Sequence, residues 1–94
     1  MNQYQEQERG QRAKDLLESP MFREAIDTLR AGIVEKWRTC PIRDIDGQHE
    51  LKLMDKVLTD VEQYLKVTID TGKLAEIQLA QERKITELKR HGIR

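Results

Sequence analysis

The sequence predicts an all-α protein: an antiparallel helical hairpin, with a short helix before it and a charged helix after it. Three observations support this fold. Apolar residues recur at spacings of three and four in two long stretches. A proline stands at the start of the first stretch and another at its end. Of the 94 residues, 36% are charged and 4% are aromatic, which favours amphipathic helices over a β-sandwich.

The first segment, residues 1–18, is polar and rich in Gln, Glu and Arg, and its only apolar cluster is Ala13, Leu16 and Leu17. We predict a short helix from about Gln5 to Leu17. A glycine inside a helix is unfavourable, so Gly10 is expected to weaken or interrupt it. With so little apolar surface, this arm is expected to become ordered on contact with a partner.

Residues 19–72 are predicted to form the hairpin. Ser19 can cap a helix by accepting a backbone N–H hydrogen bond, and Pro20 suits the first helical position. The helix that follows is expected to end before Pro41, because the residue before a proline is biased away from helical geometry.

The second hairpin helix begins after a loop at residues 40–47, with Asp44 or Asp46 as its cap. We expect this helix to end at Thr71-Gly72, because glycine readily adopts the left-handed conformation found at helix ends. Alternating β-branched residues at 65–70 leave a strand as an alternative there, but a heptad pattern runs into this stretch and favours a helix.

Apolar residues line one face of each hairpin helix, with spacings of four, three, four and four in the first and three, four, three and four in the second. These faces are expected to pack together. Because a chain this short buries little surface, we also expect copies to share the faces in an oligomeric helical bundle. The predicted core and oligomer seam consists of Phe22, Ile26, Leu29, Ile33, Trp37, Leu51, Met54, Leu58, Val61 and Leu65.

The segment 73–94 is predicted to be a charged helix as far as Arg90, followed by a short tail. This helix could pair with another subunit through an apolar stripe on one side, which is weakened by Gln81. The stripe consists of Leu74, Ile77, Gln81, Ile85 and Leu88. Residues 82–94 contain five basic and two acidic side chains, whereas residues 41–72 contain four basic and seven acidic ones. The two regions are expected to attract each other, within a chain or between chains.

The sequence offers little for catalysis or cofactor binding, so we predict a non-enzymatic protein without a cofactor. Residues 44–47 resemble part of a calcium loop, but the ligands required at its first and twelfth positions are missing. His49 and His91 have no partner at metal-ligand spacing, and Cys40 is the single cysteine. A reducing cytosol is the expected location, and no secretory signal or transmembrane segment is expected.

Two basic clusters are candidates for binding an anion or a partner. Trp37 could hold a flat anion with two neighbouring guanidinium groups, although packing on the next helix is the favoured interpretation. The basic side chains near the C-terminus could contact nucleic acid, but a solvated or subunit-pairing helix face is favoured. The candidate residues are Trp37, Arg38, Arg43, Arg83, Lys84, Lys89 and Arg90.

Residues 13–79 resemble small uncharacterised helical proteins of tailed bacteriophages. The resemblance is carried by Leu-Leu-Glu-Ser-Pro-Met-Phe-Arg-Glu-Ala at 16–25, Pro-Ile-Arg-Asp at 41–44 and Thr-Gly-Lys-Leu-Ala-Glu at 71–76. It implies a phage origin and carries over no site residue.

The sequence is therefore compatible with three functions. The first is a non-enzymatic interaction protein of virion assembly or genome packaging, which binds its own copies and a phage or host protein. The second is an anti-defence inhibitor, which binds a host immune protein or sequesters a nucleotide signal. The third is a nucleic-acid-binding accessory protein. All three place the chain in the host cytosol, with virion association possible in the first, and none involves a membrane.

Overall fold

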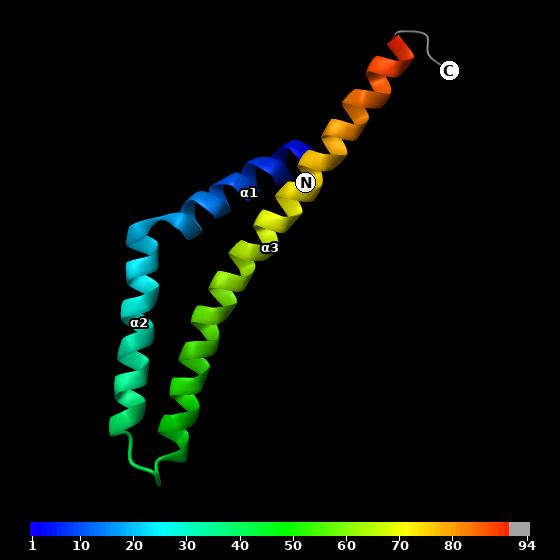
Figure 1. The fold of residues 1–94 in the computed structure, drawn as a ribbon. Coiled ribbons are helices and arrows are strands. Elements are labelled where there is room, and N and C mark those ends of the chain that lie inside the picture. The colour runs from blue at the N-terminus through cyan, green and yellow to red at the C-terminus, as the bar shows by residue number, and fades with distance from the viewer. Residues whose placement is uncertain (91–94) are drawn as a thin grey trace. The chain divides into compact units, whose positions relative to one another are not determined.

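The computed structural model describes residues 1–90 and contains three helices: α1 (Gln3–Glu18), α2 (Pro20–Thr39) and α3 (Ile45–Arg90) (Figure 1). The described residues contain no strand, so the all-α prediction is confirmed. The chain divides into two units. Unit 1 comprises Met1–Asp15 and Leu65–Arg94, and unit 2 comprises Leu16–Tyr64. The predicted tail at 91–94 lies outside the described residues.

The beginnings of α1 and α2 follow from local hydrogen bonds. Asn2 Oδ1 accepts from the backbone N–H of Gln5 at 2.9 Å, and Gln5 Oε1 accepts from the backbone N–H of Asn2 at 3.1 Å. This reciprocal cap starts α1 two residues earlier than predicted. Ser19 Oγ accepts from the backbone N–H of Phe22 at 3.4 Å, and Pro20 is the first residue of α2, as predicted.

Hydrogen bonds define both ends of the loop between α2 and α3. The backbone N–H of Cys40 donates to the carbonyl of Trp37 at 3.2 Å, and α2 ends before Pro41 as predicted. Asp44 caps α3, because its Oδ1 accepts from the backbone N–H of Gly47 at 2.9 Å. Asp44 was one of the two predicted caps, and it satisfies an N–H that has no partner within the helix.

The predicted helix end at Gly72 is wrong. α3 continues without a break through Gly72 to Arg90, so the helix expected to begin at residue 73 is the continuation of α3. The stretch at 65–70 is helical, and the strand alternative is excluded. Gly10 likewise lies inside α1 and does not interrupt it.

Both glycines lie inside helices because the helices of unit 1 meet at these positions. A Cβ atom added to Gly10 would lie 2.9 Å from the Cα of Gly72, and one added to Gly72 would lie 2.9 Å from the Cα of Gly10. Neither position has room for a side chain, because the obstructing atoms belong to the backbone. The close approach therefore offsets the unfavourable helix propensity of glycine.

Small and medium apolar residues fill the rest of this contact. Ala13 is buried on α1, and Ala75 and Leu79 are buried on α3, with Ala75 only 1% exposed. At the edge, Gln3 Nε2 donates to Gln78 Oε1 at 3.1 Å. Unit 1 is thus held together by backbone proximity and a few small side chains. Neither of its two segments has enough apolar surface to form a core alone.

No helix within residues 1–90 is both long enough and apolar enough to cross a membrane.

Candidate functional site: apolar grooves on the α2–α3 pair

In unit 2, ion pairs fix the register between α2 and the first part of α3. Arg23 Nη1 donates to Glu62 Oε2 at 3.0 Å, and Arg30 Nη2 donates to Glu62 Oε1 at 2.8 Å. Arg30 also reaches Asp55 Oδ1 at 3.4 Å. The Glu62 side chain is only 13% exposed, so these charge-assisted hydrogen bonds satisfy a carboxylate that water reaches poorly.

The Arg30 hydrogen bond, followed by that of Arg23, lowers the pKa of the Glu62 carboxyl, and the same contact with Glu62 raises the pKa of Arg30. The stabilising contribution of Glu62 is therefore fully present above the unfolded-state pKa of about 4.3. It is lost as the pH falls through the lower folded-state pKa. We expect the free energy of unfolding of unit 2 to decrease over this acidic range.

Glu62→Gln tests this contribution. At neutral pH the substitution is expected to lower the free energy of unfolding by about 1.5–3 kcal/mol, because it removes the charge from hydrogen bonds to two arginines. Urea unfolding at neutral and acidic pH should show a smaller loss of stability on acidification than in the wild type. Asp60→Asn is the control, since Asp60 makes only an exposed pair with Lys56 one turn away and should change little. If E62Q were as acid-sensitive as the wild type, other carboxylates would be responsible.

The predicted seam divides into covered and exposed residues. Ile26 and Leu65 are buried. Leu29 and Trp37 are 56% and 60% exposed. The remaining seam residues also divide: Phe22, Ile33, Leu51 and Leu58 are half-buried, whereas Met54 and Val61 are exposed. One chain therefore covers only part of the apolar surface that its periodicity creates.

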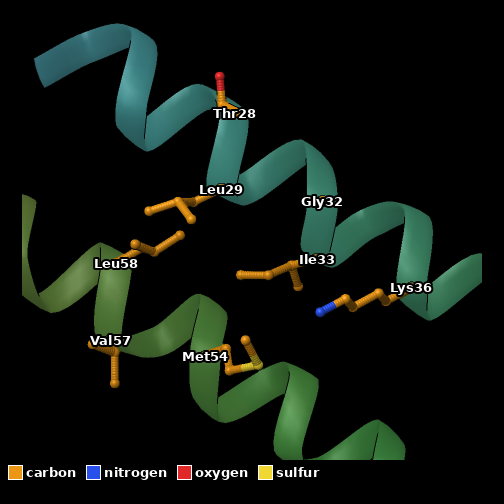
Figure 2. Close-up of a pocket in the computed structure, with 8 residues that line it drawn as sticks. All are labelled: Thr28, Leu29, Gly32, Ile33, Lys36, Met54, Val57 and Leu58. Carbon is orange, nitrogen blue, oxygen red and sulfur yellow. The ribbon is translucent and has the colours of Figure 1, made fainter. Parts of the chain in front are cut away.

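Exposed and half-buried residues of this seam line a groove between α2 and α3, which we call the front groove, with a cavity volume of about 390 Å³. Figure 2 shows Leu29 of α2 and Leu58 of α3 pointing toward each other across it, with Ile33 and Met54 further along. Gly32 leaves α2 without a side chain here, and a Cβ atom added to it would meet nothing within 4 Å. The full lining is Thr28, Leu29, Gly32, Ile33, Lys36, Met54, Val57 and Leu58.

A second groove, the Trp37 groove, lies beside Trp37 and has a cavity volume of about 600 Å³. It is lined by Arg30, Ile33, Val34, Trp37, Ile45, Gln48, His49, Leu51, Lys52 and Asp55. Arg38 and Arg43, which we expected beside Trp37 around an anion, are exposed and are not part of this lining. The cation that does line the groove from α2, Arg30, is already paired with Glu62 and Asp55.

In unit 1, the predicted C-terminal stripe is exposed along α3, and Leu74, Ile77, Ile85 and Leu88 all face solvent. Leu74 follows the buried Gly72 by two residues, which is about 200° around a helix. The C-terminal stripe (Leu74, Ile77, Gln81, Ile85 and Leu88) therefore lies on the face opposite the contact with α1. The four candidate basic residues of this region, Arg83, Lys84, Lys89 and Arg90, are exposed too.

Cys40 is poorly suited to act as a nucleophile. Burial, together with the nearby Asp44 carboxylate, raises the pKa of the Cys40 thiol, whereas nucleophilic attack requires the thiolate. Across residues 1–90, no three His, Cys, Asp or Glu side chains are close enough together to hold a metal ion.

Comparison with family models, with curated proteins and with solved structures finds no match to this chain.

Proposed function

We propose that this protein is a non-enzymatic interaction protein whose α2–α3 pair, an antiparallel hairpin, presents apolar grooves to protein partners. The observation that carries the proposal is the exposure of large apolar side chains on both units. The buried apolar residues of the described chain are Ala13, Ile26, Leu65, Ala75 and Leu79, and two of these five are alanines. Leucine, isoleucine, valine and tryptophan side chains remain on the surface instead.

The exposed large apolar side chains are numerous within each unit. In unit 2 they include Leu29, Val34, Trp37, Leu53, Met54, Val57 and Val61, and in unit 1 they include Leu74, Ile77, Ile85 and Leu88. Extended apolar patches on a small protein mark interaction surfaces.

The setting we propose is phage assembly or genome packaging, which rests on the resemblance carried by residues 13–79. The test is quantitative mass spectrometry of virions and assembly intermediates from a phage that encodes this chain. We expect the wild-type chain to be present at a defined copy number and the Leu29→Asp variant to be lost, because a carboxylate would enter the front groove. Ala31→Asp adds the same charge to an exposed position of α2 outside the groove and should be retained. Equal incorporation of both variants would show that the front groove is not needed for entry into the virion.

The two alternative functions have less support. A nucleotide held at Trp37 would need free cations, but of the Arg and Lys residues that line the groove Arg30 is engaged by Glu62 and Asp55, which leaves Lys52. Binding of nucleic acid by the C-terminal segment would be opposed by Glu82 and Glu87, which interrupt the basic residues. Stabilisation of the purified protein by a nucleotide, or a steep salt dependence of DNA binding, would reverse this preference.

A further inference from the structure

We infer that the front groove is occupied by the C-terminal stripe of a second copy of this chain, so that two copies exchange these segments in a closed dimer. This inference rests on the proposed function, because it names the partner of the same groove.

The two units carry opposite charge. Unit 2 contains seven basic and ten acidic side chains, a net charge of −3. Unit 1 contains ten basic and seven acidic side chains, a net charge of +3. The groove belongs to unit 2 and the stripe to unit 1. A groove of one copy that binds the stripe of another therefore brings units of opposite charge together. Contact between two grooves, or between two stripes, would bring together units of the same charge, which repel each other.

Exposed glutamates flank the front groove, whose lining contains one basic side chain, Lys36, and lysines flank the stripe. On α2, Glu24 and Glu35 stand four residues before and seven residues after Thr28, which places both on the rim of the front groove. On α3, Lys84 follows Gln81 by three residues and Lys89 follows Ile85 by four, so lysines flank both sides of the stripe, with Glu82 as the acidic neighbour of Lys89 on one side. Glu24, Glu35 and both lysines are exposed.

The shapes also fit. A two-helix groove with an apolar floor is completed by a third helix, which packs its stripe between the other two. From Ile77 to Leu88 the stripe is about 16 Å long, and Gly32 gives an approaching helix room near the α2 backbone. In a closed dimer each copy supplies one stripe and one groove, so both grooves are filled and no further copy is recruited.

The experiment uses two charge-reversed variants of the full chain, measured by sedimentation equilibrium. Lys84→Glu with Lys89→Glu gives an acidic stripe, and Glu24→Lys with Glu35→Lys gives a basic groove rim. We expect the wild type to be a dimer, and each variant alone to dimerise about tenfold or more weakly, because both of its contacts become repulsive. Mixed together, the two variants should form a heterodimer of near wild-type affinity, since each stripe then meets a groove of opposite charge.

A matched control is provided by Arg83→Glu with Arg90→Glu, which makes the same change of net charge on the face of α3 away from the stripe. This variant should dimerise about as well as the wild type. The inference is overturned if the wild type stays monomeric or grows beyond a dimer, if the mixed variants do not pair, or if the control is weakened equally. None of these results would contradict the proposed function, which is tested separately by virion incorporation of the Leu29→Asp variant.

Discussion

Replacing Gly72 with leucine is expected to release α1 from unit 1. Any Cβ atom at this position would lie 2.9 Å from the Cα of Gly10 and 3.0 Å from the carbonyl oxygen of Glu6, and backbone atoms cannot move aside as a flexible side chain can. Overpacking of this kind destabilises by about 1–3 kcal/mol, and a buried leucine is expected to reach the upper end. Because an isolated helix of this length is marginal in water, α1 should then lose its structure.

Hydrogen exchange followed by mass spectrometry would detect this release. In Gly72→Leu, amides in Gln3–Glu18 should exchange far faster than in the wild type, while those of α2 keep their protection. Gly32→Ala is the matched control, because a Cβ atom there meets nothing within 4 Å. It should raise the free energy of unfolding by up to about 1 kcal/mol through helix propensity. Unchanged protection of α1 in Gly72→Leu would show that the glycine contact does not hold the helix.

Ile26→Asp is expected to unfold unit 2. Ile26 is 5% exposed and is the one buried residue of α2, so the substitution buries a carboxylate, and the arginines one turn away on either side, Arg23 and Arg30, are already paired with Glu62. A buried, unpaired charge destabilises by about 3–5 kcal/mol. That is a large part of the stability available to so short a chain. Far-ultraviolet circular dichroism should show a large loss of helix at room temperature.

The control for this variant stands one turn along the same helix. Leu29 is 56% exposed, so Leu29→Asp adds the same charge without burying it. This variant should keep its helical spectrum and its hydrogen-exchange protection when measured as a dilute monomer. If both variants unfolded, the front groove would be part of the core rather than a surface. If neither did, Ile26 would not be a core residue.

Helix type and most helix ends could be predicted from the sequence because they depend on local chemistry. Ser19 and Asp44 cap helices through hydrogen bonds to residues three positions away, and Pro41 restricts its immediate neighbour. The same local reasoning was wrong for Gly72, because glycine also suits a place where two backbones touch. Only the three-dimensional position of Gly10 decides between these two uses, and the two residues are far apart in the sequence.

The candidate site was predicted less completely. Periodicity identified the apolar faces that contain Leu29, Met54 and the C-terminal stripe, but it could not say which of them a single chain covers. The pairing of Arg23 and Arg30 with Glu62 was not predicted, since charged residues are frequent on these helices and nothing local marks which ones meet. The position of α1 against α3 was missed for the same reason.

Unit 1 is made of two separate segments of the chain, and this determines when it can fold. Its two segments, Met1–Asp15 and Leu65–Arg94, are far apart in the sequence, whereas unit 2 is the continuous stretch between them. During synthesis, α1 leaves the ribosome well before the residues around Gly72, Ala75 and Leu79 that receive it. The α2–α3 pair can therefore form while α1 still lacks its binding surface. Pulse-labelled refolding should accordingly protect amides around Ile26 before those around Ala13.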